Sequence, residues 1–211
     1  DYRPFAGINT EYSFLGVRGA APYNTFPEMV EHFKKTGQVV KFGHTGTGGI
    51  YHLTQEVLLK KAGLKAQGIP FASSAELLSN LLGGHVDATN LDPVPASTYV
   101  KDKQLKILGQ FGAKRCDNEV LRDVPTFKEQ GYDVTLQIFK FLAAPAGIAE
   151  DKFTFLEDKF KEIFADKRWA EFNSKFHNVP FFADGIGVLD RLIPEIKANE
   201  QILKDLGLTV K

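Results

Sequence analysis

The chain has 211 residues and carries 26 basic and 26 acidic side chains, so its formal net charge is zero. Proteins that bind nucleic acids usually carry an excess of basic residues, and this chain has none, so no nucleic-acid partner is expected. The longest apolar stretch, about residues 141–149, is far shorter than the ~20 residues of a membrane helix, which predicts no direct membrane insertion. The length is that of one or two domains, and the single cysteine excludes an intrachain disulfide.

Strand-like and helix-like segments alternate along the chain, which predicts an α/β fold with mainly parallel strands. Thr25 and Glu28 have the spacing of a capping box, and Ser73 and Glu76 repeat it, so each pair predicts the start of a helix. The expected strands are residues 12–18, 39–43, 67–70, 86–89, 105–110, 134–143 and 208–210. The expected helices are residues 26–36, 49–62, 75–82, 94–101, 150–165 and 167–176, with a last one within 185–206. The dense alternation over residues 39–110 predicts one complete α/β lobe, with the C-terminal helices outside it.

The strongest local signal is a Gly-rich segment, residues 42–53, that joins an expected strand to an expected helix. Glycines let a ligand approach the backbone closely, and the N–H groups of such a turn, with the positive end of the helix dipole, favour an anion. Threonine hydroxyls add further donors. The residues expected to bind a phosphate or carboxylate here are Thr45, Gly46, Thr47, Gly48 and Gly49. A plain tight turn between strand and helix remains the alternative.

Two nucleotide-binding patterns are excluded by single positions in this segment. Gly43 and Gly48 have the spacing of a phosphate-binding P-loop. That loop requires Lys followed by Ser or Thr, and Gly49-Ile50 stands there instead. A dinucleotide-binding pattern also begins here, but Tyr51 occupies the position of its third glycine. A carboxylate is therefore expected in preference to a phosphate.

A second polar segment follows the strand expected at residues 86–89. Ligands of open α/β sheets bind outside the carboxyl ends of the strands, so Thr89, Asn90 and Asp92 are expected to line the same cleft as the Gly-rich turn. The alternative is that Asn90 or Asp92 only caps the next helix.

Histidines and carboxylates give no sign of catalysis. No histidine pair has the spacing of metal ligands within one motif, and no carboxylates stand out as an acid–base pair. We therefore expect no catalytic residue, no metal and no cofactor. His52, one turn into the helix after the Gly-rich turn, is included among the expected ligand-binding residues, with local packing or capping as its alternative.

The order of these motifs along the chain resembles that of a known family. The chain resembles the solute-binding proteins of tripartite tricarboxylate transporters. The segments that carry the resemblance are residues 21–25, 42–49, 52–53, 69–71, 82–87, 123–134, 144–147 and 203–208. The run from Val124 to Tyr132 and the Ala-Pro-Ala-Gly turn ending at Gly147 are its most specific parts.

The resemblance implies a periplasmic-binding-protein-like fold of type II, the two-lobed Venus flytrap. It implies a periplasmic protein that captures a small mono-, di- or tricarboxylate and delivers it to the membrane permease subunits of the transporter. In the family, the turn that matches residues 45–49 binds the ligand's carboxyl group. The segment that matches residues 89–92 and the aromatic position that matches Phe139 help to close the pocket.

One departure from the family concerns length. The family begins with a further stretch of roughly a hundred residues that builds most of its first lobe. We therefore expect residues 19–137 to form one complete ligand-binding lobe, and residues 1–18 and 138–211 to form the C-terminal part of an incomplete one. Residues 1–10 also lack the basic and apolar regions of a signal peptide, so the export signal is expected outside this chain.

Two other functions remain as alternatives at this point. A cytoplasmic effector-sensing domain of a transcription regulator has the same broad architecture, but would need a DNA-binding helical module. An enzyme could use the Gly-rich turn to bind a phosphate substrate, but would need an acid, base or metal set. The identity of the carboxylate does not follow from the sequence.

Overall fold

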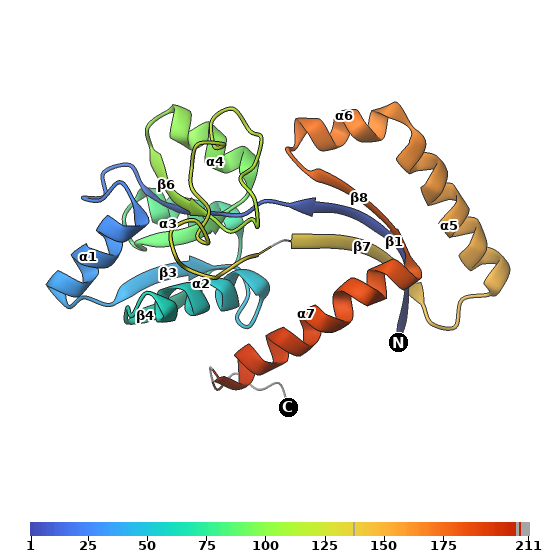
Figure 1. The fold of residues 1–211 in the computed structure, drawn as a ribbon, viewed down its shortest axis with the longest axis horizontal. Helices are drawn as coiled ribbons and strands as arrows, with labels where there is room; N and C mark the ends of the chain where they lie inside the picture. Colours follow the sequence, from blue (N-terminus) through green and yellow to red (C-terminus); the bar gives the residue numbers. More distant parts are fainter. Residues whose placement is uncertain (137, 206, 208–211) are drawn as a thin grey trace. The chain divides into compact units, whose positions relative to one another are not determined.

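The computed structural model describes residues 1–136, 138–205 and 207. The chain forms two compact units, which we call the terminal unit and the central unit. The terminal unit consists of Asp1–Glu11 and Ile138–Lys204, and the central unit takes in the chain between them from Tyr12 onward. Figure 1 shows the blue N-terminal strand of the terminal unit beside the yellow strand β7 (Ile138–Pro145), in which the chain returns to that unit.

Strands and helices alternate in the central unit, as the sequence predicts. Its strands are β2 (Phe14–Arg18), β3 (Val40–His44), β4 (Ala66–Pro70), β5 (Ala88–Leu91) and β6 (Leu105–Gln110). Its helices are α1 (Phe26–Thr36), α2 (Ile50–Lys61), α3 (Ser74–Leu82) and α4 (Pro93–Lys101). The terminal unit contains β1 (Tyr2–Glu11), β7, α5 (Glu150–Ala165), α6 (Lys167–Lys175), β8 (Val179–Asp184) and α7 (Gly185–Asp205).

The central sheet has the strand order β4-β3-β5-β2-β6. β3 pairs in parallel with β4 and β5, whereas β2 runs antiparallel to both β5 and β6. The prediction of mainly parallel strands is therefore confirmed for β3, β4, β5 and β6, and it is wrong for β2. The reason lies in the connection through α1. It returns the chain to the side of the sheet on which β2 ended, so β3 starts there and runs in the opposite direction to β2.

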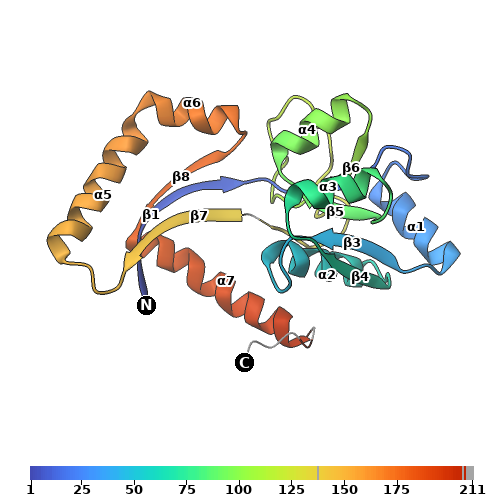
Figure 2. The same ribbon diagram turned by 180° about the vertical axis from the view of Figure 1, so that it is seen from behind.

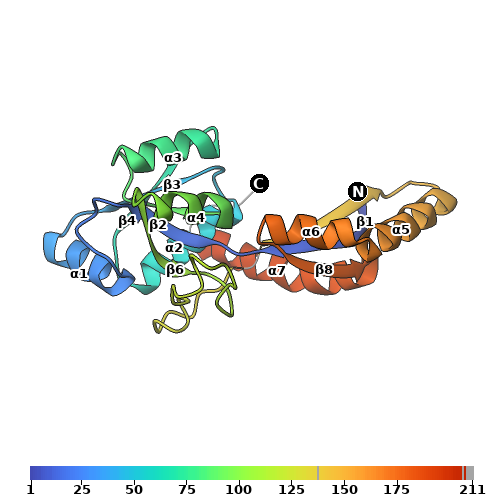
Figure 3. The same cartoon turned by 90° about the horizontal axis from the view of Figure 1, so that it is seen from above.

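The helices α2 and α3 cover opposite faces of this sheet (Figure 3). Phe42 of β3 faces α2, where its ring lies 5.7 Å from that of His52. The next residue, Gly43, faces α3, because a Cβ at this position would lie 2.0 Å from Leu77 Cδ1. Successive residues of a strand point to opposite faces, so glycine at position 43 is what lets α3 pack directly on the sheet.

Both predicted capping boxes begin helices of the central unit. Thr25 Oγ1 accepts the Glu28 N–H at 3.3 Å, and Ser73 Oγ accepts the Glu76 N–H at 3.2 Å. In each box the glutamate accepts a second N–H from the residue before the cap rather than from the cap itself. Two N–H groups at each helix start therefore have partners, which stabilises the positions of α1 and α3.

The terminal unit has an antiparallel sheet of order β7-β1-β8, with β1 in the middle (Figure 2). α5 packs on β1 through aromatic rings. Phe5 of β1 lies edge-on to Phe153 at 6.2 Å and to Phe160 at 5.4 Å, measured between ring centroids. These rings form the core of the unit together with the buried Ala6 and Ala144.

The expected boundary between the two units is wrong by several residues. The sequence predicts residues 1–18 in the incomplete lobe, but β2 belongs to the central sheet, where Phe14 pairs with Leu91 and Arg18 with Leu105. The change of sheet occurs near Tyr12. Only two residues separate β1 from β2, and neither is a glycine or proline, so the sequence gives no turn signal there.

Other differences concern the strands. β1 and β8 were not predicted, and the strand expected at residues 134–143 begins only at Ile138. Val134 and Leu136 are buried outside any strand, with the Leu136 N–H donating to the Phe111 carbonyl at 2.8 Å. The strand expected at residues 208–210 lies outside the described residues. Among the helices that the structure describes, none combines the length and apolarity of a membrane span.

Candidate functional site

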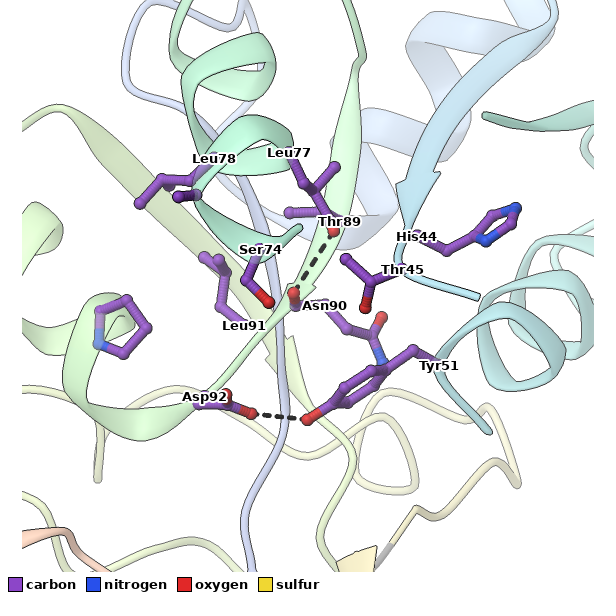
Figure 4. A pocket seen from close by; sticks show the side chains of 12 residues that line it. His44, Thr45, Tyr51, Ser74, Leu77, Leu78, Thr89, Asn90, Leu91 and Asp92 are labelled. Atoms are coloured by element: carbon purple, nitrogen blue, oxygen red, sulfur yellow. Dashed lines mark hydrogen bonds between the residues drawn. The ribbon is translucent and has the colours of Figure 1, made fainter. Parts of the chain in front are cut away.

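A cavity of about 180 Å³ opens in the central unit at the carboxyl ends of β3 and β5 (Figure 4). The N-terminal turns of α2, α3 and α4 all contribute to its walls. The lining residues are His44, Thr45, Tyr51, Ser74, Ala75, Leu77, Leu78, Thr89, Asn90, Leu91, Asp92 and Pro95. One cavity therefore lies at three helix N-termini, each with a partial positive charge.

Four of the predicted site residues, Thr45, Thr89, Asn90 and Asp92, line this cavity together. The remainder of the Gly-rich turn lies next to Thr45 along the chain, with Gly46, Thr47 and Gly49 exposed and Gly48 partly exposed. The structure thus brings the turn and residues 89–92 to the same edge of the sheet. Their contact with a ligand stays a prediction.

The Gly-rich turn uses some of its own donors. The Gly48 N–H donates to His52 Nδ1 at 3.0 Å, and the Gly49 N–H donates to the Gly46 carbonyl at 3.1 Å. Both groups are therefore engaged inside the turn in this structure. Gly46 and Gly48 have backbone φ values of 119° and 77°, which residues other than glycine rarely adopt.

Two histidine rings lie beneath the turn. His44 and His52 stack with ring centroids 4.2 Å apart, and both are buried. Burial lowers the pKa of both, and for His44 the nearby His52 adds to the effect while a backbone hydrogen bond with Gly46 opposes it. His52 Nε2 lies 3.8 Å from Glu56 Oε1, and burial raises the pKa of that carboxyl group. Because burial and the accepted Gly48 N–H favour the neutral imidazole, this contact is not an ion pair near pH 7.

Two side chains of β5 have hydrogen-bond partners, one in the backbone of β3 and one in Ser13, the residue before β2. The Thr89 hydroxyl donates to the Gly43 carbonyl at 3.0 Å. The Asn90 amide nitrogen donates to Ser13 Oγ at 3.3 Å. Within the described residues, the Asn90 Oδ1 is buried with no hydrogen-bond donor. Thr89 thus fixes the end of β3, and Asn90 keeps an unused acceptor beside the cavity.

Tyr51 and Asp92 form a hydrogen bond between the starts of α2 and α4. The Tyr51 hydroxyl donates to Asp92 Oδ1 at 2.5 Å (Figure 4). Asp92 occupies the N-cap position of α4, but its side chain makes no capping hydrogen bond. The alternative that Asp92 serves only as a helix cap is therefore wrong, because its carboxylate is turned to Tyr51.

Sequence reasoning missed Tyr51 and the whole contribution of α3. Ser74 and Ala75 lie at the start of α3, a short loop after the carboxyl end of β4. The rule that pointed to residues 89–92 also applies to this strand end and would have found them. Leu77, Leu78, Leu91 and Pro95 give the cavity an apolar wall. No periodicity signals such a wall, because these leucines also fill the core beside α3.

The charges around the cavity are few. With His44 neutral, Asp92 is the one formally charged side chain among the described lining residues, and the lining includes no Lys or Arg. Figure 4 shows the His44 ring directed away from the other lining side chains. Attraction for an anion would therefore come from N–H groups, hydroxyls and helix dipoles rather than from a side-chain cation.

Phe139 belongs to the terminal unit. It lies on β7, with its ring edge-on to Phe181 at 5.1 Å and the Arg191 guanidinium 4.6 Å from its centroid. Its expected role in closing the pocket stays a prediction. No cluster of metal-binding side chains occurs among the residues that the structure describes.

Several solved structures share this fold. The periplasmic binding protein BugD matches with a TM-score of 0.88 and 21% identity, over 100% of this chain and 71% of its own. An R. palustris protein with adipate gives a TM-score of 0.87 and 19% identity, over 98% and 69%. MatC from Rhodopseudomonas palustris with bound malate gives 0.82 and 18%, over 96% and 69%. The chain thus has the α/β fold of periplasmic binding proteins, with one complete lobe and part of a second.

Sequence comparison agrees with the fold. A UPF0065 protein of Cupriavidus necator is 30% identical over 198 residues, which is 93% of this chain and 60% of that protein. The chain therefore spans less than two thirds of this relative's length. The family model of the tripartite tricarboxylate transporter family receptor matches residues 1–208. By a match over almost its whole length, this chain belongs to the receptor family of tripartite tricarboxylate transporters.

Proposed function

We propose that this protein captures a small carboxylate, with the ligand's carboxyl group at the carboxyl edge of the central sheet. The observation that carries the proposal is the cavity at the N-terminal turns of α2, α3 and α4. Helix N-termini attract anions through unpaired N–H groups and the helix dipole. Thr45 and Ser74 bring hydroxyl groups to the same cavity.

The lining also limits how the rest of the ligand is held. Leu77, Leu91 and Pro95 offer apolar contacts for a carbon chain, while Asp92 repels a second carboxylate that comes close to it. Mono-, di- and tricarboxylates all remain within the proposal, provided that any further carboxyl group lies away from Asp92. The adipate and malate of the two R. palustris neighbours are examples of the ligand class.

We assign the two units to the two lobes of a binding protein. The central unit would be the complete ligand-binding lobe, and the terminal unit would be part of the other lobe. Phe139, on β7 of the terminal unit, would contribute from that second lobe to the closed pocket.

As a member of a receptor family, the protein would act by binding without catalysis. It would work in the periplasm and deliver its carboxylate to the membrane permease subunits of a tripartite tricarboxylate transporter. The family match over residues 1–208 favours this role over an effector-sensing domain or a phosphate-binding enzyme.

Calorimetric titration with monocarboxylates, dicarboxylates and citrate tests the proposal, with nucleotides and sugars as controls. The decisive variant is Gly49→Asp. Gly49 is the N-cap of α2 with φ of −73°, where aspartate is a favoured residue. A Cβ here would lie 3.1 Å from the Gly46 carbonyl oxygen, so the turn must shift slightly, and it must do so equally in the matched asparagine variant. The new negative charge would repel a bound carboxylate and weaken its affinity by about tenfold or more.

Gly49→Asn is the matched control, because asparagine caps the helix equally well but carries no charge. We expect it to change the affinity by less than about threefold. Equal affinities for the two folded variants would remove the turn from the site. Binding of nucleotides or sugars, with no binding of any carboxylate, would contradict the proposed function itself.

A further inference from the structure

His52 contacts the Gly-rich turn from its buried side. Its Nδ1 accepts the Gly48 N–H at 3.0 Å, and only 8% of its side chain is exposed. Gly48 adopts a φ of 77°. The hydrogen bond therefore links a buried ring to Gly48, one of the two glycines of the turn whose positive φ sets the direction of the neighbouring peptide groups.

The hydrogen bond requires a particular protonation state of the ring. A nitrogen that accepts an N–H carries no proton, so the proton of the neutral imidazole is on Nε2, on the side of Glu56. An imidazolium has N–H groups at both nitrogens and cannot accept. Protonation of His52 would thus place the Gly48 N–H against another donor and break the contact.

The surroundings of His52 leave little room for a compensating movement. Its ring packs against the rings of Phe42 and His44, with centroids at 5.7 and 4.2 Å, and those two rings also contact each other at 6.0 Å. On the β4 side, Gly68 is so close that a Cβ there would lie 3.0 Å from His52 Nε2. The titratable groups that face the ring are His44 from β3 and Glu56 from α2, and β4 contributes only the uncharged Gly68.

We propose that His52 is a positioning residue that, through Gly48, holds the turn in its carboxylate-binding conformation only while its imidazole is neutral. This inference rests on the proposed function, because it assigns a pH dependence to the same site. Carboxylate affinity should be full near pH 7.5 and should decrease as the pH falls below the ordinary histidine range of about 6.5. The burial that lowers the pKa of His52 moves the loss of affinity to the acid side of that range.

Two substitutions separate positioning from mere packing. In His52→Asn the side-chain oxygen can take the place of Nδ1 as acceptor, and it does not titrate. In His52→Leu the ring is replaced by an apolar side chain without an acceptor. We expect His52→Asn to keep malate and adipate affinities within about threefold of the parent at pH 7.5, and His52→Leu to lose about tenfold.

The pH profile between 5 and 8 is the critical measurement. Affinity of the parent protein should fall by up to about tenfold per pH unit at the acid end, relative to His52→Asn at the same pH. The ratio of the two affinities at each pH cancels the effect of the ligand's own titration. A His44→Asn variant should keep the pH dependence if His52 is the group that titrates. Parallel profiles for the parent and His52→Asn would overturn the inference.

A ligand-free measurement distinguishes failure of this inference from failure of the proposed function. The NMR signal of the Gly48 amide should shift with pH in step with the His52 ring, and this coupling should vanish in His52→Asn. If carboxylates bind but the Gly48 amide does not follow His52, the inference is wrong and the proposed function stands. If no carboxylate binds but the amide does follow His52, the proposed function is wrong and the ring still positions the turn.

Discussion

The central and terminal units differ in where they place their large apolar side chains. In the central unit the rings of Phe14, Phe26, Phe42, Phe111 and Phe127 are all 0% exposed. In the terminal unit, Phe155 is 59% exposed, Phe182 is 48% exposed and Ile186 is 72% exposed. The elements of the central unit therefore close their own core, whereas the terminal unit leaves apolar surface uncovered. Among the described residues, the central unit thus buries more of its large apolar side chains than the terminal unit does.

Ionisable groups show the same contrast. In the central unit, burial raises the pKa of Tyr23 to about 12. In the terminal unit, an exposed ion pair with Arg168 lowers the pKa of Asp166 to about 2. A shift caused by burial depends on packing, while a shift caused by an exposed pair depends on a few surface contacts and is open to screening by salt. The raised pKa of Tyr23 should therefore depend on the packing of the central unit, and the lowered pKa of Asp166 on salt and on its partner Arg168.

The largest expected effect is on the stability of the two cores. Phe14→Ala should lower the free energy of unfolding of the central unit by about 3–5 kcal/mol, because it leaves a cavity among fully buried side chains. Phe172→Ala, at a position that is 46% exposed in the terminal unit, should cost about 1 kcal/mol or less. Urea unfolding followed by circular dichroism and by tryptophan fluorescence measures both.

Tryptophan fluorescence reports on the terminal unit, because the only tryptophan of the chain is Trp169 in α6. If the units unfold separately, Phe14→Ala should leave the fluorescence midpoint near that of the parent and move the dichroism transition. A terminal unit that unfolds last in urea would contradict the comparison of the two cores.

How far the sequence predicts the structure differs between these units as well. The helices of the central unit were predicted from local chemistry, because Thr25 and Ser73 supply caps whose partners lie three residues away. The reversal of β2 was not, because strand direction depends on pairing with β5 and β6, which are distant in sequence. In the terminal unit, β8 has the sequence Val-Pro-Phe-Phe-Ala-Asp, in which apolar and polar residue types do not alternate, so the sequence does not indicate a strand.

The candidate site was predictable to the extent that it follows strand ends. The end of β3 gave Thr45, and the end of β5 gave Thr89, Asn90 and Asp92, all of which line the cavity. The hydrogen bond from Gly48 to His52 could not be predicted, since it depends on the three-dimensional path of the turn. The sequence identified the turn as a source of N–H donors but not that two of these donors are used internally.

Helix caps give a smaller test of the comparison. Ser73→Ala removes the cap of α3 in the central unit and should cost about 1 kcal/mol. Ala149, the N-cap residue of α5 in the terminal unit, has extended backbone angles and no side-chain hydrogen bond. Ala149→Ser should therefore stabilise the terminal unit by about 0.5–1 kcal/mol, as measured by the midpoint of Trp169 fluorescence in urea. A loss of stability in Ala149→Ser would show that the start of α5 is constrained by something other than its missing cap.

The smallest expected effects are on titration, and they separate burial from ion pairing directly. Tyr23 should titrate near 12 in ultraviolet absorbance, at low and at high salt alike, because burial is the main cause of its raised pKa. Its stabilising contribution is present below the unfolded pKa of about 10 and is lost as the pH rises from there through the folded value. Because the chain has six tyrosines, the difference spectrum against Tyr23→Phe isolates this one.

Asp166 should behave in the opposite way. Its carboxylate accepts hydrogen bonds from the Arg168 guanidinium at 2.6 Å and from the Arg168 backbone N–H at 2.9 Å, which hold its pKa at about 2. Its stabilising contribution is present above the unfolded pKa of about 4 and is lost as the pH falls through the folded value.

Carboxyl carbon NMR measures the pKa of Asp166. This pKa should rise in Arg168→Ala, and it should rise partly in the parent at about 1 M salt, where the Debye length shrinks to about 3 Å. The backbone N–H survives the substitution, so Arg168→Ala should still titrate below an unperturbed aspartate. If neither the substitution nor the salt changes the pKa of Asp166, the backbone hydrogen bond alone lowers it. Asp166 would then no longer illustrate the contrast between buried groups and exposed ion pairs.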